Sequence, residues 1–229
     1  RILGWRGLAD QTLASATRRH REQRVTAVKK FEDGLTRCSW LNGDALYREY
    51  HDTEWGVPVT GDQQIFERIA LEGFQAGLSW ITILKRREGF RKAFKNFDLQ
   101  KVSRLTESDI ERLMLDEGII RNRAKIESTI RNANLILELQ KSGQSISEIV
   151  WSFAPPQSKR KRPATSFEWL ATTAESVALS KHLRKLGFGF VGPTTMYALM
   201  QSMGVVNDHL EGCSHRARVE SARNAFERP

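Results

Sequence analysis

The sequence has little of several features that define whole classes of protein. It has only two cysteines in 229 residues, and no stretch approaches the roughly 18 uninterrupted apolar residues of a membrane helix. Its beginning shows no positive, apolar and small-residue secretory pattern. Strict alternation of apolar and polar residues, the sign of half-buried strands, is almost absent. These absences exclude a membrane-spanning or sheet-based protein, and we expect an all-α protein that works inside a cell.

Positive charge is in excess, but it is unevenly placed along the chain. The 36 Lys and Arg residues outnumber the 27 Asp and Glu residues, which gives a net charge of +9. The first 30 residues carry eight basic side chains against Asp10 and Glu22, and residues 159–162 are four consecutive basic residues. Basic tails and loops are usually solvated segments, and the rest of the chain is close to neutral. Bulk charge therefore says little about a nucleic-acid partner.

Apolar periodicity divides the chain into three parts. Residues 1–33 lack it and predict a flexible basic N-terminal extension, residues 34–214 predict a helical domain, and residues 215–229 predict a polar C-terminal tail that frays. The prolines and basic residues of segment 154–165 predict an exposed loop within the domain. We predict a helix that Asp62 caps, another that Ser108 or Asp109 opens and a long helix that ends at Gly143. Two more helices are predicted over Ala174–Leu186 and Pro193–Met203.

The two cysteines, Cys38 and Cys213, lie near opposite ends of the domain. They could be buried thiols or a disulfide, although an intracellular setting argues against the disulfide. His209 and Cys213 are four residues apart, on one face of a helical turn, and His51 follows Cys38. These four side chains could complete a closed tetrahedral zinc site that leaves no open position for a catalytic water. His215 is an alternative ligand, and we expect His20 and His182 to be surface residues.

Several long motifs are distinctive. They are R-C-S-W at 37–40, Y-R-E-Y-H-D-T-E-W-G-V-P at 47–58, L-E-G-F-Q-A-G-L-S-W at 71–80, F-V-G at 190–192 and V-N-D-H at 206–209. Together they resemble the bacterial 3-methyladenine DNA glycosylase I family, over residues 37–213. The resemblance implies a helix-hairpin-helix DNA glycosylase architecture, with one structural zinc per chain that joins the N- and C-terminal segments of the domain. The zinc ligands that it implies are Cys38, His51, His209 and Cys213.

The resemblance also implies a DNA-binding hairpin at residues 186–195. Glycines let a backbone approach a phosphate, and a following helix directs its free N–H groups towards it. Without the resemblance, a glycine-rich turn before a helix is more often a plain helix end and helix start. Nearby Lys181, Arg184 or Lys185 would add phosphate contacts. The hairpin residues expected to contact DNA are Gly187, Gly189, Gly192 and Thr194.

The resemblance places four aromatic residues around a flipped base: Trp40, Tyr47, Tyr50 and Trp80. Glu72 would hold that base and is the expected catalytic residue, since a carboxylate suits a cationic base with an exocyclic amine. The ordinary interpretation of these residues is a solvated glutamate and aromatic core side chains. We assign the three remaining tryptophans of the domain to the core: Trp55, Trp151 and Trp169.

The implied activity is base-excision repair, in which 3-methyladenine is flipped out of double-stranded alkylated DNA and its N-glycosidic bond is hydrolysed. Leu78 is expected to fill the gap that the base leaves in the duplex. No lysine is assigned as a nucleophile, so no strand-cutting lyase activity is expected, and Asp208 is not assigned as the catalytic acid. We expect a monomer in the bacterial cytoplasm, associated with the nucleoid.

Two rival functions are weighed against this one. A non-enzymatic helix-hairpin-helix DNA-binding module with a structural zinc would explain the hairpin and the metal, but not the aromatic residues near Glu72. A zinc-dependent nucleobase deaminase needs a His-x-Glu motif and a Pro-Cys-x-x-Cys pair around an open metal. The sequence has no Pro-Cys-x-x-Cys pair, and the expected metal site is closed.

Overall fold

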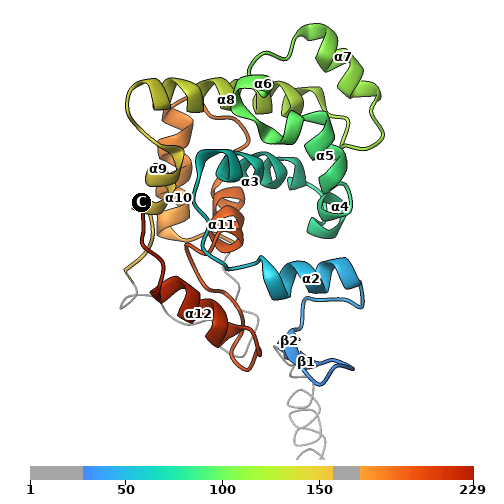
Figure 1. Cartoon of the computed structure of the whole chain (residues 1–229), viewed down its shortest axis with the longest axis vertical. Helices are drawn as coiled ribbons and strands as arrows, with labels where there is room; N and C mark the ends of the chain where they lie inside the picture. The colour runs from blue at the N-terminus through green and yellow to red at the C-terminus, as the bar shows by residue number, and fades with distance from the viewer. Residues whose placement is uncertain (1–27, 157–170) are drawn as a thin grey trace, which may run out of the picture.

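The computed structural model describes residues 28–156 and 171–229 (Figure 1). These residues form a helical fold, as the sequence predicts, together with one short strand pair. The elements of this region are β1 (Val28–Lys30), β2 (Thr36–Cys38), α2 (Ala45–Thr53), α3 (Asp62–Gln75), α4 (Trp80–Leu84), α5 (Arg87–Ala93), the 3-10 turn η1 (Lys95–Phe97), α6 (Leu99–Val102), α7 (Glu107–Leu115), α8 (Arg123–Lys141), α9 (Ile146–Ser152), α10 (Ala174–Lys185), α11 (Pro193–Ser202) and α12 (Arg216–Asn224).

The strand pair corrects the predicted start of the folded domain. β1 pairs antiparallel with β2, and Val28 lies opposite Cys38. The prediction of a flexible extension is therefore wrong for residues 28–33, which belong to this hairpin. Strands of three residues are too short to show alternation in the sequence, which is why the pattern missed them. Residues 1–27 lie outside the described residues.

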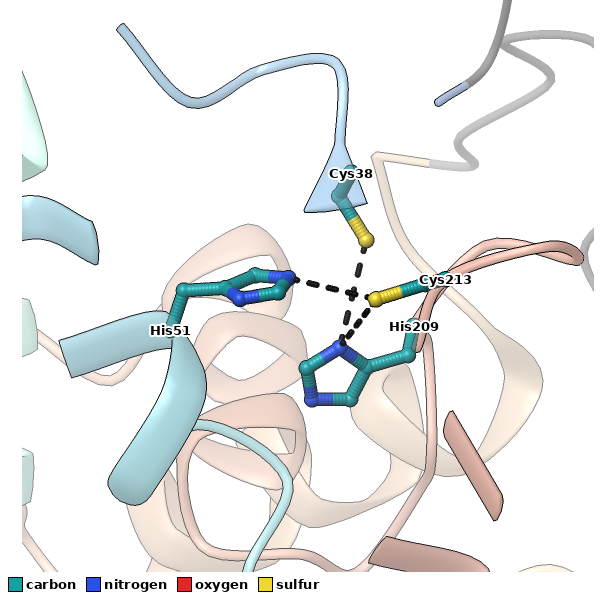
Figure 2. Close-up of side chains that lie close together, drawn as sticks. All are labelled: Cys38, His51, His209 and Cys213. Carbon is teal, nitrogen blue, oxygen red and sulfur yellow. Dashed lines mark hydrogen bonds between the residues drawn. The ribbon is translucent and has the colours of Figure 1, made fainter. Parts of the chain in front are cut away.

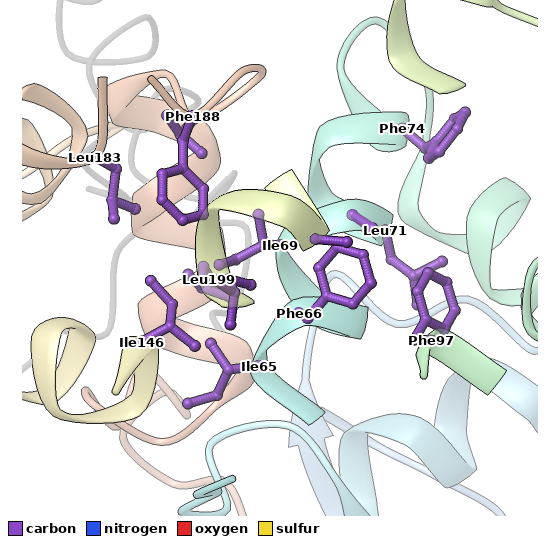
Figure 3. Close-up of a cluster of buried hydrophobic side chains, with 14 of the residues drawn as sticks. Ile65, Phe66, Ile69, Leu71, Phe74, Phe97, Ile146, Leu183, Phe188 and Leu199 are labelled. Carbon is purple, nitrogen blue, oxygen red and sulfur yellow. The ribbon is translucent and has the colours of Figure 1, made fainter. Parts of the chain in front are cut away.

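Helix α3 lies at the centre of the molecule, between α8 and α11 (Figures 1 and 3). Ile65, Phe66 and Ile69 recur along it at helical spacing and are at most 1% exposed. Full burial of one such side chain contributes about 1.5–3 kcal/mol. In Figure 3 they lie among Leu199 of α11 and other core side chains. This packing fixes α3 as the element against which the functional side chains are positioned.

Capping residues set some of the helix boundaries, but Asp62 is the first residue of α3 and not its cap, which is Gly61. Thr106 caps α7, because its hydroxyl accepts from the Asp109 N–H while the Asp109 carboxylate accepts from the Thr106 N–H. The helix therefore begins at Glu107, slightly earlier than predicted. Helix α8 ends just before Gly143, whose φ of 77° is the left-handed conformation that a glycine helix end adopts. The bounds of α10 and α11 agree with the predicted helices to within one residue.

The C-terminal segment corrects another expectation. Residues 216–224 form α12 rather than a fraying tail. Val219 is fully buried, and the Arg223 guanidinium donates to the carbonyls of Gly204 at 2.8 Å and Val205 at 3.0 Å. The ring of Phe226 lies 4.7 Å from that of Trp151, which is buried as predicted. Val219 is the one buried residue of this helix, and one such position gives too little periodicity to be detected.

Some predictions fall partly or wholly outside the described residues. Residues 154–156, at the start of the predicted loop, have no regular structure. The basic run 159–162, Trp169 and His20 are not among the described residues. His182 is exposed, as predicted. Within the described ranges, no helix is both long enough and apolar enough to cross a membrane.

Candidate active site and metal centre

A cavity of about 160 Å³ lies where α2, α3, α4 and α11 meet. This is far more than the roughly 10–15 Å³ that one water molecule needs, so the cavity has room for a small organic ligand. Nine residues line it: Trp40, Tyr47, Tyr50, Trp55, Glu72, Gln75, Trp80, Ala198 and Gln201.

All five residues that the sequence places around a base are in this lining, although they come from three separate parts of the chain. Trp55 was assigned to the core, and it is indeed only 6% exposed, but it also faces the cavity. Gln75, Ala198 and Gln201 were not predicted. Gln75 stands inside a recognised motif and could have been found there, whereas nothing in the sequence shows which side of α11 meets the cavity.

Helix α2 supplies one aromatic wall. Asp44 caps this helix by accepting from the backbone N–H groups of Leu46 and Tyr47. Tyr47 and Tyr50 are three residues apart and therefore share a face. The Tyr47 ring centroid is 4.9 Å from that of Trp40, and the Tyr50 centroid is 5.4 Å from that of Trp80. Such contacts hold the rings in fixed orientations.

Glu72 is the acidic residue of the cavity. It lies on α3 and is 4% exposed, and it lines the cavity together with the aromatic residues of α2. Burial raises the pKa of its carboxyl group to about 8, although a hydrogen bond with Ser202 and the positive charge of Arg68 act in the opposite direction. Its Oε2 atom is buried and has no hydrogen-bond partner among the described residues. A buried carboxylate oxygen of this kind is a ready acceptor for a ligand's N–H group.

The neighbouring polar groups of the cavity are neutral. Burial, together with the charge of Glu72, raises the pKa of Tyr47 to about 12, and the same two causes raise that of Tyr50. The indole N–H of Trp80 is buried and also lacks a hydrogen-bond partner in the described part of the chain. The cavity thus combines neutral aromatic walls with one titratable acid, which is an arrangement suited to a flat ligand that carries positive charge.

Next to the cavity, four buried side chains form a group that could bind a metal ion (Figure 2). Cys38, His51 and His209 are fully buried and Cys213 is 6% exposed. Their ligand atoms all lie within 4.8 Å of one another. The Cys213 sulfur is 3.6 Å from His51 Nε2 and 3.5 Å from His209 Nδ1, and the Cys38 sulfur is 3.9 Å from His209 Nδ1. Tetrahedral coordination with bonds of ~2.0–2.3 Å separates sulfur and nitrogen ligands by about 3.6 Å, so the spacing fits.

One nitrogen of each histidine ring contacts an oxygen atom outside the group, and the other nitrogen faces the cysteine sulfurs. His51 Nδ1 is 2.8 Å from the Asp52 carboxylate, and His209 Nε2 is 3.0 Å from the Trp55 carbonyl oxygen. Because these oxygens accept hydrogen bonds, each contact holds the ring proton there and leaves the opposite nitrogen unprotonated. The Leu210 N–H donates to the Cys38 sulfur at 3.3 Å.

The pKa values of the two thiols are also consistent with cation binding. Their hydrogen bond with one another, together with burial, raises the pKa of Cys38, while the same bond lowers that of Cys213. The lowered pKa of Cys213 favours the thiolate form, which is the form that binds a metal ion. The alternative ligand, His215, instead lies 3.1 Å from Asp52, in a second group with that residue and His51. Asp52 is held in turn by the Arg37 guanidinium, at 2.8 Å.

The predicted DNA-contacting residues lie on two separate turns. Leu78 lies on the turn between α3 and α4 and is 42% exposed. Residues 186–192 connect α10 and α11, which pack on each other. Gly192 precedes the first turn of α11 without a side-chain cap, and Thr194 is exposed in that turn. Arg184 approaches Gly192, whereas Lys181 and Lys185 are exposed on α10.

Different structural constraints call for glycine at different positions of the hairpin. Gly187 has a φ of 96°, the left-handed conformation of a helix end. At Gly189 a side chain would clash with Ser128 and Arg131 of α8, so this glycine permits close packing within the protein. The expected DNA contact of Gly189 stays a prediction. A Cβ atom at Gly192 would meet no atom nearer than 3.6 Å, so there is room for a side chain at this position.

Asp208 is buried and takes part in a local network. Its Oδ2 atom accepts from the Tyr197 hydroxyl and from the Gln201 side-chain amide, both at 2.7 Å. Asp208 is not among the residues that line the cavity, whereas Gln201 is. The bond to Asp208 fixes the orientation of the Gln201 amide at the cavity.

Comparisons with known proteins agree with these features. The methyladenine glycosylase family matches residues 40–217 of the chain. DNA-3-methyladenine glycosylase 1 of Escherichia coli is 49% identical over 179 residues, which cover 78% of this chain and 96% of that protein. A crystal structure of 3-methyladenine DNA glycosylase I superimposes with a TM-score of 0.73 at 46% identity and covers 78% of this chain and 98% of the other.

A further solved structure is informative because it contains a ligand. It is a tyrosine-to-phenylalanine variant of 3-methyladenine DNA glycosylase I in complex with 3-methyladenine. It matches with a TM-score of 0.71 at 33% identity, over 76% of this chain and 94% of that chain. The chain described above, with its aromatic cavity and buried Cys/His group, therefore belongs to the methyladenine glycosylase family.

Proposed function

We propose that this protein is a monofunctional DNA repair glycosylase that releases 3-methyladenine from double-stranded alkylated DNA by hydrolysis. The observation that carries the proposal is the buried, unpartnered carboxylate oxygen of Glu72 in a cavity walled by aromatic rings. A base inside a duplex must first rotate out to reach such a cavity, which costs a few kcal/mol. Stacking on aromatic rings recovers about 1–3 kcal/mol per base.

Selectivity follows from the charge of the lesion. In DNA, 3-methyladenine carries a positive charge on the ring system and an exocyclic amine that can donate to Glu72. A neutral adenine would not compensate the cost of ionising a carboxyl group whose pKa is about 8 in the unliganded cavity. Glu72 therefore favours binding of the damaged base over binding of normal adenine.

The chemical step needs modest help from the protein. The bond between the sugar C1′ and the base nitrogen breaks, and its electrons neutralise the cationic base. Water then supplies hydroxide to C1′ and a proton to solvent. The anionic form of Glu72 stabilises the cationic substrate and the developing positive charge near it. No lysine is among the residues that line the cavity, so we expect no covalent intermediate and no strand cleavage.

DNA binding is assigned to the two exposed turns. The N-terminal end of α11, with Gly192 and Thr194, presents free backbone N–H groups to a phosphate, and Arg184 adds positive charge there. Leu78 is placed to enter the duplex at the position that the base leaves. If so, Leu78→Ala should lose most base release from duplex DNA while its affinity for free 3-methyladenine stays unchanged. Full activity of this variant on duplex DNA would refute the role of Leu78.

The metal is inferred to be zinc. Two thiolates and two imidazoles in a closed tetrahedral set are the ligands of structural zinc sites, and the four side chains leave no position for substrate. The ion would hold the loop of Trp40 and the end of α2 against the C-terminal segment. It would thereby stabilise the aromatic wall without taking part in the reaction.

The test of this function is to incubate the purified protein with duplex DNA that contains 3-methyladenine and to measure the free base released. An enzyme releases base with multiple turnovers and leaves an uncut strand with an abasic site. A non-enzymatic DNA-binding module would bind the duplex without releasing base, and that result would overturn the proposal. Undamaged duplex of the same sequence is the control.

A further inference from the structure

Helix α8 buries a row of three polar side chains on one face, beside a fourth, Thr129. Lys125, Ser128 and Asn132 are 8%, 2% and 3% exposed. Their spacing of three and four residues places them in one row along the helix. A row of buried polar groups, one of them a lysine, is unusual because each must be compensated by hydrogen bonds. Two of the three make such bonds to the two turns assigned above to DNA.

Lys125 holds the end of α3. Its ammonium group donates to the carbonyl oxygens of Phe74 at 2.9 Å and Ala76 at 2.8 Å. These carbonyls lie at the C-terminal end of α3, where a positive charge is favourable. The chain then turns through Gly77, whose φ is 85°, and presents Leu78 to solvent. Lys125 therefore fixes the point from which the Leu78 turn projects.

Asn132 holds the hairpin between α10 and α11. Its side-chain amide donates to the Gly189 carbonyl at 3.2 Å and accepts from the Gly189 N–H at 3.0 Å. The following residue, Phe190, packs on Gly73 of α3, and its ring centroid is 5.8 Å from the Lys125 ammonium. The two turns are thus tied to the same short stretch of α8, with roughly 10 Å of helix between Lys125 and Asn132.

We propose that Lys125 is a positioning residue, which holds the Leu78 turn at a fixed distance from the phosphate-binding hairpin that Asn132 anchors. The inference rests on the proposed function. The hairpin binds the DNA backbone and Leu78 enters the base stack. The spacing between them therefore selects which nucleotide is displaced. Misplacement of such a group by about 1 Å can cost up to about 100-fold in rate. Lys125 does not line the cavity, so it acts on duplex processing and not on recognition of the free base.

The test compares Lys125→Met with wild type in two assays. One measures single-turnover base release from duplex DNA, and the other measures the Kd of free 3-methyladenine by tryptophan fluorescence. We expect release to fall by about 10-fold or more and the free-base Kd to change by less than about 2-fold. Lys125→Arg, which keeps the donors and the charge, should recover part of the rate. Lys141→Met is the matched control, because Lys141 lies on the same helix with a 72% exposed side chain.

A double-mutant cycle with Leu78→Ala separates positioning from a general structural role. If Lys125 acts through the turn, Lys125→Met should change the rate by less than about 2-fold once Leu78 has been removed. An equal loss in both backgrounds, or a parallel loss of free-base affinity, would overturn the inference. If Lys125→Met does not fold, the same cycle is run with Lys125→Arg. A wild-type protein that binds free base but releases none from DNA would instead contradict the proposed function.

Discussion

Glu72 lowers the stability of the fold that contains it. Because burial raises the pKa of its carboxyl group from 4.5 to about 8, the folded protein retains a proton that the unfolded chain has already released at neutral pH. The free energy of unfolding must therefore fall as pH rises from about 5 to about 8. A residue that destabilises the fold in this way is expected where it serves recognition or catalysis.

This argument predicts the effect of Glu72→Gln on stability. Glutamine keeps the shape but does not titrate, so the variant should gain stability relative to wild type as pH rises. The gain is at most about 1.4 kcal/mol per pH unit between pH 5 and 8. Thermal unfolding of both proteins across this range is the measurement, with the exposed Glu49→Gln as control. A difference in Tm that does not depend on pH would show that Glu72 is not a buried carboxyl group.

At the residue scale, long motifs were informative and isolated positions were not. Glu72 and the four aromatic residues could be predicted because they stand in recognisable motifs. Ala198 and Gln201 could not, since α11 is largely buried and its apolar pattern does not distinguish the side that meets the cavity from the side that meets α10. Trp55 shows that a core residue and a cavity residue need not be alternatives.

Among the elements, the strand β2, helix α2 and the segment after α11 converge on the Cys/His group. Cys38 ends β2, His51 lies on α2, and His209 and Cys213 lie on the loop before α12. Ion pairs of Asp52 with Arg37 and His215 also join these segments, and the metal group lies in a small apolar cluster separate from the main core. The binding energy of a metal ion here is therefore part of the folding energy.

Cys213→Ser is expected to reduce both bound zinc and stability. Serine is a much poorer zinc ligand than cysteine, so the variant should lose the ion, and its Tm should fall by several degrees. Metal analysis by mass spectrometry and thermal unfolding are the two measurements. A variant that keeps its Tm and loses only base release would mean that the metal is catalytic.

Helix α12 is expected to contribute to stability through its one buried apolar residue. Val219 contacts the turn at Gly56, next to the chain segment that holds the metal group. Val219→Ala should lower the free energy of unfolding by about 1–3 kcal/mol, because it leaves a cavity in a fully buried site. Val177→Ala on α10, where the side chain is 46% exposed, is the control. Equal stability of both variants would mean that α12 is not packed on the domain.

The sequence predicted the longer elements better than the short ones. Helices α3, α8, α10 and α11 have several apolar residues at helical spacing, with capping residues or a glycine at their ends. The hairpin of β1 and β2 and helix α12 have one or two buried residues each, and their stability comes from contacts with distant segments. Local patterns contain no information on such contacts.

In the whole molecule, the cavity lies between two apolar clusters. The main core packs α3 against α8 and α11, and the smaller cluster contains Cys38, Tyr50 and Trp55. Trp80 packs against both clusters. The acid comes from the main core, while most of the aromatic wall comes from the cluster that contains the metal group. The cavity that we propose as the base-binding site thus lies at the boundary between the two clusters.

The central claim is that one buried glutamate holds a cationic base that has left the duplex. Single-turnover release of 3-methyladenine from duplex DNA by wild type and by Glu72→Gln, with metal content and folding verified for both, tests it most directly. We expect the variant to remain folded, to keep the metal content of the wild type and to release base at least about 100-fold more slowly. Release by Glu72→Gln within about 2-fold of the wild-type rate would contradict this account.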